Sequence, residues 1–180
     1  MLTIIAAVLM LTMALTLTAC GSSTTDPTTA PTEAPATDAP SADAAISVND
    51  TTFTYGGVSI ALDGSIDEAI AALGEPLDVK SELSCHGEGD DKTYTYDGFI
   101  VKSYPKDGVD RVLEVLINAE GIPTSKGITI GSSLSDVITA YGDGYNTIAK
   151  FYVYNAGNGK TLRFLIEDDA VAQIDYYFNV

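Results

Sequence analysis

The sequence predicts an α+β fold built from two tandem repeats, each a short helix followed by three antiparallel strands, that share one core. Three observations predict it: a helical pattern that occurs twice, strand-like alternation after each copy, and turn residues between the alternating runs. The first repeat is expected over 46–122 and the second over 123–180, so the folded part spans 46–180.

The helical pattern runs from Ser65 to Gly74 and again, without gaps, from Ser133 to Gly142. Each copy starts with a Ser suited to the N-cap, carries an acid three residues later, and has a Gly just past the last turn. Helices of about eight residues are marginal alone. We therefore expect both to pack on one core, and one continuous sheet would supply it.

The expected strands also match between the copies. Lys92–Tyr96 corresponds to Lys150–Tyr154, and Val112–Asn118 corresponds to Gln173–Asn179. Period-two alternation predicts that apolar residues of two neighbouring strands face the core. These residues are Leu162, Phe164 and Ile166 on one strand, and Ile174, Tyr176 and Phe178 on the next.

Charge narrows the classes of partner. The chain has 180 residues with 25 acidic and 9 basic side chains, for a formal charge of −16. Nucleic acid and anionic membrane surfaces both attract positively charged proteins, so neither is expected as an electrostatic partner. With only 2 Cys, the chain cannot be a disulfide-dense scaffold.

The N-terminus carries an export pattern. Leu2–Leu17 is an apolar run shorter than the ~20 residues of a transmembrane helix, and its length is typical of a signal peptide. The following Leu17–Gly21 resembles the lipobox of bacterial lipoproteins, which implies cleavage between Ala19 and Cys20 and a diacylglyceryl group on the Cys20 thiol. The usual Lys/Arg-rich start is absent, so an upstream start codon, plain secretion and a retained anchor stay open.

Residues 1–19 are therefore expected to be a lipoprotein signal peptide, and residues 20–45 a lipidated Cys followed by a disordered tether. The tether is rich in Ser, Thr, Ala and Pro, which cannot bury enough apolar surface to offset the ordering entropy. At ~0.8 kcal/mol per buried methylene, two acyl chains attach a protein durably. The expected location is the extracytoplasmic face of the bacterial membrane; a flexible tail without a spacing role has the same composition.

The repeat pattern resembles a known group of proteins. Its helix signature leading into strands resembles the β-lactamase-inhibitor-protein-like lipoproteins and the related small outer-membrane assembly lipoproteins. Ser84-Cys85, Asp91–Tyr96 and Gly127–Gly142 are also similar to uncharacterised lipoproteins of clostridia-type Firmicutes. The resemblance implies an extracytoplasmic binding or assembly module without a catalytic residue. Inhibition of a secreted hydrolase is the alternative, although the paired disulfides of those inhibitors are absent here.

Cys85 and His86 are the residues most typical of chemistry in the predicted domain. A Cys-His pair can be a nucleophile with its base, or two metal ligands. Neighbours on a strand point to opposite faces, however, so this pair is poorly placed to touch. Because Val79, Ser81, Leu83 and Cys85 alternate with other residues, we expect a half-buried structural thiol at a strand end that reacts slowly. An enzyme using Cys85 and His86 remains the less favoured alternative, and no metal or cofactor is expected.

Two acidic clusters, Glu88–Asp91 and Glu167–Asp169, lack the ligand spacing of an EF-hand. We interpret them as solvated turns, with weak surface calcium binding as an alternative. The chain also has no Gly-rich phosphate loop and no Gly-x-Ser-x-Gly elbow. Hydrolysis by two carboxylates stays open, because sequence does not show which acids converge.

Repeated tyrosines form the candidate binding site. Their neighbours Thr93 and Thr95 become Phe151 and Val153 in the second copy, which suggests that the neighbours face the core and the tyrosines face outward. Packing of the tyrosines beneath the helices is the alternative. The prediction is a non-enzymatic envelope module that binds an unknown envelope protein or wall component. The candidate binding residues are Tyr94, Tyr96, Tyr152 and Tyr154.

Overall fold

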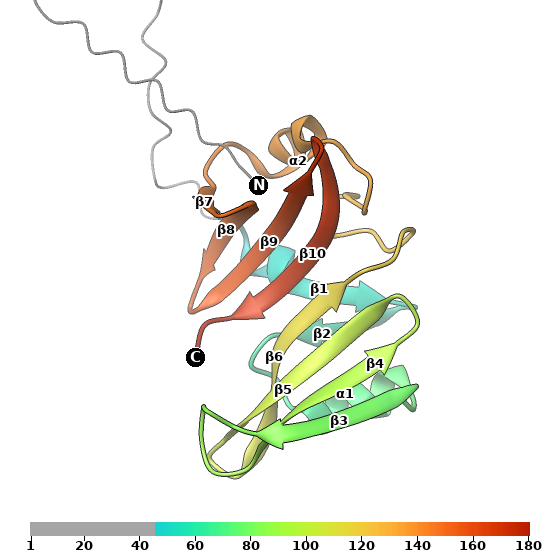
Figure 1. Ribbon diagram of the computed structural model, residues 1–180, viewed down its shortest axis with the longest axis vertical. Coiled ribbons are helices and arrows are strands. Elements are labelled where there is room, and N and C mark those ends of the chain that lie inside the picture. The colour runs from blue at the N-terminus through green and yellow to red at the C-terminus, as the bar shows by residue number, and fades with distance from the viewer. Residues whose placement is uncertain (1–45) are drawn as a thin grey trace, which may run out of the picture. The chain divides into compact units, whose positions relative to one another are not determined.

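The computed structural model describes residues 46–180, and β-strands are its main elements. Eight of them form one antiparallel sheet in the order β3-β4-β5-β6-β10-β9-β8-β7 (Figure 1). Two four-stranded meanders are thus joined where β6 pairs with β10. The strands are β3 (Asp78–Leu83), β4 (Asp90–Tyr96), β5 (Phe99–Lys106), β6 (Val109–Ile117), β7 (Asn146–Ile148), β8 (Phe151–Gly157), β9 (Lys160–Glu167) and β10 (Ala170–Phe178).

A hairpin and two helices pack on one face of this sheet, which we call the core face. The ring of Phe53 in the hairpin lies 5.7 Å from that of Tyr176, and the ring of Tyr141 in α2 lies 5.4 Å from that of Phe164. Figure 1 shows the hairpin and α1 behind the sheet. These elements are η1 (Val48–Thr51), β1 (Thr52–Tyr55), β2 (Val58–Ala61), α1 (Ile66–Leu73) and α2 (Leu134–Tyr141).

The predicted fold class is wrong. The described part of the chain is mainly β, with one eight-stranded sheet and two short α-helices, rather than two helix-plus-three-strand repeats. Each meander has four strands rather than three, because β3 and β7 precede the three strands expected in each repeat. Both are edge strands whose residues are all exposed, so they are held by pairing with β4 and β8 rather than by burial in the core.

The positions predicted for the helices are confirmed. α1 follows Ser65 and ends before Gly74, and α2 follows Ser133 and ends before Gly142. Both glycines have positive φ, 88° and 83°, a conformation in which Gly carries no Cβ penalty. Ser133 forms the expected capping box with Asp136, whereas the side chain of Ser65 makes no cap hydrogen bond.

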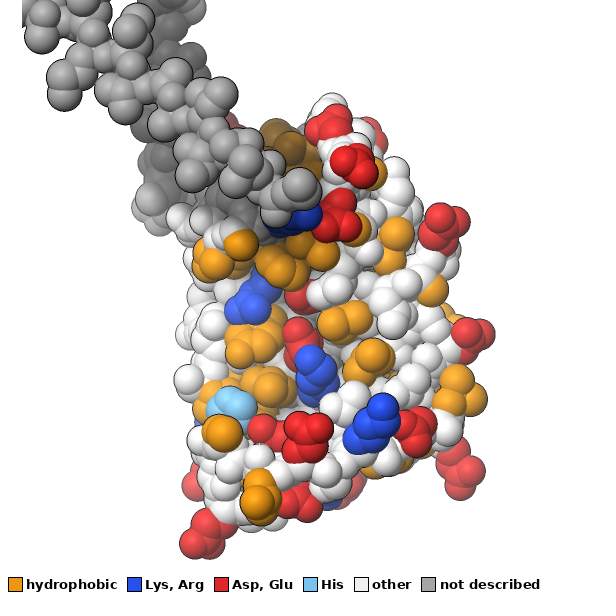
Figure 2. Space-filling model, in the orientation of Figure 1, with side chains coloured by type: hydrophobic (Ala, Val, Ile, Leu, Met, Phe, Trp, Pro, Cys, Tyr) orange, Lys and Arg blue, Asp and Glu red, His pale blue; other side chains and the backbone are white. Residues whose placement is uncertain are grey.

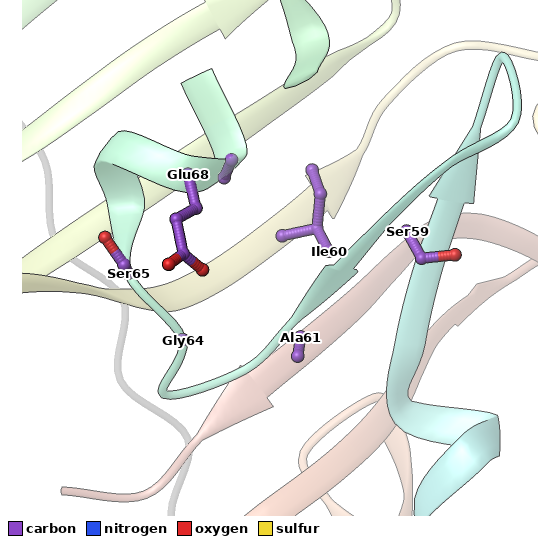
Figure 3. A pocket seen from close by; sticks show the side chains of 7 residues that line it. Ser59, Ile60, Ala61, Gly64, Ser65 and Glu68 are labelled. Atoms are coloured by element: carbon purple, nitrogen blue, oxygen red, sulfur yellow. The ribbon is translucent and has the colours of Figure 1, made fainter. Parts of the chain in front are cut away.

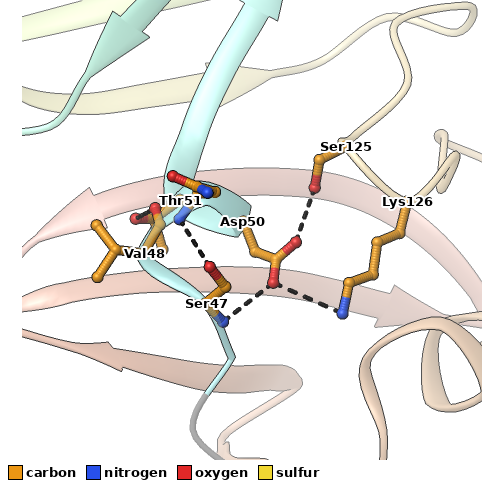
Figure 4. Close-up of polar contacts among 7 residues, drawn as sticks. Ser47, Val48, Asp50, Thr51, Ser125 and Lys126 are labelled. Atoms are coloured by element: carbon orange, nitrogen blue, oxygen red, sulfur yellow. Dashed lines mark hydrogen bonds and ion pairs between the residues drawn. The ribbon is translucent and has the colours of Figure 1, made fainter.

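A buried carboxylate fixes the start of the described chain (Figure 4). Asp50 Oδ2 accepts a hydrogen bond from the Ser47 backbone N–H at 3.0 Å and lies 3.6 Å from Lys126 Nζ. Asp50 Oδ1 accepts one from the Ser125 hydroxyl at 3.0 Å. Asp50 therefore ties η1 to the segment that connects β6 with α2.

The predicted signal peptide (1–19), the cleavage site between Ala19 and Cys20, and the tether (20–45) lie outside the described residues. Over residues 46–180, no helix is long and apolar enough to cross a membrane.

Candidate functional site

The predicted tyrosine surface is not exposed. Tyr94 and Tyr154 are buried on the core face, at 6% and 0% exposure, and Tyr96 and Tyr152 are half-buried against the same core. The expectation that these rings face outward is therefore wrong. Instead the intervening residues, such as Thr93 and Val153, face the other side of the sheet.

Two of these tyrosines contact the ends of the helices. The Tyr96 hydroxyl donates to the Gly74 carbonyl at 3.2 Å, and the Tyr154 hydroxyl donates to the Gly142 carbonyl at 2.8 Å. Burial raises the pKa of Tyr154, so its hydroxyl stays protonated and able to donate. These tyrosines hold the helices on the sheet, and as candidate binding residues they are not available on the surface.

Cys85 lies in the loop between β3 and β4 and is exposed, so the prediction of a half-buried thiol is wrong. Its neighbour His86 turns toward a carboxylate, with His86 Nδ1 3.2 Å from Asp91 Oδ2. The His86 ring also meets the edge of the Tyr104 ring at 5.8 Å. The strand ends at Leu83, before the thiol, and therefore imposes no burial on it.

A cavity of about 330 Å³ lies beside His86, where the β3–β4 loop meets the β5–β6 turn. Its volume is at the lower end of the ~300–1,000 Å³ typical of small-molecule sites, but its lining is mostly polar loop residues. Cys85 is not among the lining residues, and no group of three His, Cys, Asp or Glu within residues 46–180 could hold a metal ion. The lining residues are His86, Gly87, Glu88, Pro105, Lys106, Asp107 and Gly108.

A second cavity, of about 140 Å³, lies between β2 and the start of α1 (Figure 3). Figure 3 shows Ser65 and Glu68 at the start of the helix, with Ser59, Ile60 and Ala61 on the strand opposite. This volume is well below the ~300 Å³ of a typical small-molecule site.

The larger candidate is the face of the sheet opposite the core face, which we call the open face. No element of residues 46–180 packs over it in Figure 1, and Figure 2 shows hydrophobic side chains interspersed with Lys, Arg, Asp and Glu across it. Solvated faces of antiparallel sheets are usually polar. The aliphatic and Phe residues of this face include Ile100, Leu116, Ile148, Phe151, Val153 and Leu165.

Strand register places Ile100, Leu116 and Val153 in one row, whereas Leu165 and Phe151 pair with each other in a neighbouring row. Ile100 pairs with Leu116, Leu116 with Asp175, Asp175 with Arg163, and Arg163 with Val153. The row therefore crosses β5, β6, β10, β9 and β8, with charged residues in the middle and apolar residues at both ends. Because cross-strand pairs lie about 5 Å apart, this forms a continuous strip.

A second row runs beside the first and is polar. Lys102 Nζ lies 2.6 Å from Glu114 Oε2, its direct cross-strand partner. Glu114 in turn pairs with Tyr177, whose ring is stacked under the guanidinium of Arg163 at 3.6 Å from the ring centroid. Arg163 Nε also donates to Thr161 Oγ1 at 3.2 Å. These contacts fix long side chains on the surface before any partner arrives, which lowers the entropic cost of binding.

Asp175 is the most buried charge of the open face, at 3% exposure. Burial is the main cause that raises its pKa to about 6; the nearby Glu114 also raises it, while Gln173, Arg163 and Lys102 act in the opposite direction. The amide of Gln173 donates to Asp175 Oδ1 at 2.7 Å. Asp175 is therefore too enclosed to contact a partner directly and serves to organise its neighbours.

Sequence analysis missed the open face because the same alternation serves both sides of a sheet. Period-two patterning identifies two faces but does not say which one is covered. The available signal was charge: Lys102, Glu114, Arg163 and Asp175 all alternate with core residues, so they had to share the uncovered side.

Comparisons with known proteins give no family. No family model and no curated protein matches the chain, and the expected resemblance to β-lactamase-inhibitor-like repeats is therefore not shown. Two solved structures are similar at a distance. One is an extracellular protein containing a SCP domain from Bacillus anthracis, with 13% identity and a TM-score of 0.40 over 66% of this chain.

The other solved structure is a DUF4309 family protein from Bacillus subtilis, with 16% identity and a TM-score of 0.44. It matches 73% of this chain and 90% of its own length, whereas this chain spans only 44% of the Bacillus anthracis protein. At these identities and TM-scores, neither likeness assigns a family or an activity to the chain.

Proposed function

We propose that this chain is a lipid-anchored, extracytoplasmic binding module of the bacterial envelope that contacts a partner protein through the open face. One observation carries the proposal: apolar residues lie at both ends of a sheet face that no element of residues 46–180 covers, with Ile100 and Leu116 at one end and Phe151 and Leu165 at the other. Apolar surface rimmed by polar groups is typical of interaction sites.

The charged residues between the two apolar ends of the open face give the surface its specificity. The ion pair of Lys102 with Glu114 and the stack of Arg163 on Tyr177 present fixed charges of both signs beside the apolar ends. A partner must match this arrangement, because burying an unmatched charge is costly. The proposal assigns no catalytic residue.

Anchoring is the other half of the proposal and is supported by the sequence alone. The Leu17–Gly21 pattern favours acylation of Cys20, and the Ser/Thr/Pro-rich segment 20–45 would leave the folded part free to meet a partner. Labelling cells with an alkynyl fatty acid should tag the wild-type chain and not Cys20→Ala. Equal labelling of both chains would exclude the anchor without bearing on the open face.

Binding is tested by capture with the full chain from native membrane extract, and in parallel with isolated cell wall. The variant Ile100→Glu/Leu165→Glu places charges within the apolar parts of the open face and should abolish capture of the partner protein. Val109→Glu is the matched control, since Val109 is an exposed apolar residue in the turn-proximal end of β6. Retention by wall alone would point to a wall component; equal capture by all variants would refute the proposed surface.

A further inference from the structure

The strand β3 at the edge of the sheet has a free side. It pairs with β4 on one side, and no strand of residues 46–180 pairs on the other (Figure 1). All six of its residues are exposed. A free edge presents unpaired backbone N–H and C=O groups, which can accept another strand.

The side chains of β3 guard this edge only in part. Proteins usually protect an exposed edge with charges, Pro, bulges or short strands. β3 carries charges, but Lys80 and Glu82 have opposite signs, so they can attract rather than repel a second copy of the strand. Here Val79 is 50% exposed and Leu83 is 89% exposed, and Leu77 just before the strand is 75% exposed. Together they form an apolar ledge, and the alternate positions on the opposite face carry Lys80 and Glu82.

The backbone contacts show which residues offer the free groups. The Ser84 N–H donates to the Gly89 carbonyl at 3.1 Å, in register with the β3–β4 pairing. Hydrogen-bonded pairs alternate along an antiparallel ladder, so Glu82 and Lys80 also direct their backbone groups toward β4. The backbone groups of Val79, Ser81 and Leu83 therefore point outward.

We propose that β3 binds a second copy of this chain, strand against strand and antiparallel, with Ser81 opposite Ser81 of the partner subunit on a two-fold axis. In this register Val79 lies opposite Leu83 of the partner subunit, and Lys80 lies opposite Glu82 of the partner subunit. Apolar residues therefore lie opposite apolar residues, and each positive charge lies opposite a negative charge. Both kinds of contact occur twice, because the two-fold axis repeats every contact. The two sheets join into one.

Charge selects this register over its neighbours. Residues whose backbone groups point outward must pair with each other, so the alternative registers differ from this one by steps of two residues. One step places Lys80 opposite its own copy and Asp78 opposite Glu82, and the other places Glu82 opposite its own copy. Like charges directly opposite one another are destabilising. The inference does not depend on the open face, because β3 lies at the edge of the sheet.

The register is tested by cross-linking single cysteines in the full chain carrying Cys85→Ser, whose own dimer yield after mild oxidation sets the background. Paired residues on adjacent strands have Cα atoms about 4.5–5.5 Å apart, within reach of a disulfide. Ser81→Cys should form a disulfide-linked dimer by itself. Lys80→Cys and Glu82→Cys should cross-link only when the two variants are mixed.

A charge swap tests the energetic argument. In the Ser81→Cys chain, Lys80→Glu should lower the association constant of the dimer roughly tenfold, measured as a lower yield of disulfide-linked dimer. The reason is that both attractions between residue 80 and Glu82 of the partner subunit become repulsions. Adding Glu82→Lys should restore the association constant. Both residues are exposed, so the thermal midpoint should stay unchanged and separate lost pairing from lost folding. Background yields from Ser81→Cys, or Lys80→Cys dimers formed without Glu82→Cys, would overturn the proposal.

Discussion

The Asp50 carboxylate accepts a 3.0 Å hydrogen bond from the Ser125 hydroxyl, across 75 positions of sequence. The same carboxylate accepts from the Ser47 backbone and lies near Lys126. A single side chain therefore closes the start of the described chain onto the connection between the two halves of the sheet. Because Asp50 is buried, its partners would be left without an acceptor if it were removed.

Asp50→Ala should lower the free energy of unfolding by about 2–3 kcal/mol, mainly through the buried hydrogen bonds rather than the partly exposed Lys126 ion pair. Urea unfolding measures the change. Glu120→Gln, at an exposed loop position, is the control and should stay within about 0.5 kcal/mol of wild type. An Asp50→Ala chain as stable as the control would show that the contact does not hold the two segments together.

Asp175 should make stability depend on pH with an unusual sign. Its pKa is raised from 3.8 to about 6 in the folded protein, so between these values the folded state binds more protons than the unfolded state. The contribution of Asp175 to the free energy of unfolding is therefore greatest below about pH 4, falls as the pH rises toward 6, and is constant above pH 6. The full effect is at most about 3 kcal/mol.

Asp175→Asn should remove that slope and stabilise the protein at pH 7 by about 1–3 kcal/mol, since an amide avoids the cost of burying a charge and still accepts from Gln173. Unfolding by urea at several pH values between 4 and 7 provides the comparison. If the Asn variant is less stable at pH 7, attraction from Arg163 and Lys102 outweighs burial.

Tyr154→Phe should destabilise the fold by about 1–2 kcal/mol. The change removes the 2.8 Å hydrogen bond to the Gly142 carbonyl and leaves a carbonyl at the end of α2 without this donor. Tyr152→Phe, on the same strand and half-buried, is the matched control and should cost less. Thermal unfolding compares the two variants; equal losses would mean that the hydroxyl does not hold α2.

Cys85 should react readily with a thiol reagent in the native protein, because it is an exposed residue of a loop. The rate should be close to that in denaturant, and the signal should disappear in Cys85→Ser. Slow labelling that speeds up on unfolding would return Cys85 to the protected role that the sequence suggested.

Sequence patterning predicted the helix positions because the signals are local. A Ser before each helix, an acid one turn later and a Gly after it specify the ends of α1 and α2 without reference to the rest of the chain. The strand faces of Leu162 and Ile174 were also predictable, since alternation is a local property.

The number of strands and the exposed surface were not predictable in the same way. The strand β3 is stabilised by pairing with β4 rather than by burial, so the alternation of its side chains did not show that it extends the sheet as an edge strand. Which face is covered depends on the path of η1, the hairpin and the helices, and Tyr94 became buried because these elements packed on its side. Tertiary packing decided both points.

Site-specific photo-cross-linking on intact cells tests the central claim most directly. A photoreactive amino acid in place of Leu165 would probe the open face, and one in place of Thr54, an exposed residue of β1, would probe the hairpin on the opposite side. The account predicts one discrete cross-linked envelope protein from position 165 and none from position 54. Cross-links from position 54 alone, or equal products from both positions, would contradict binding through the open face.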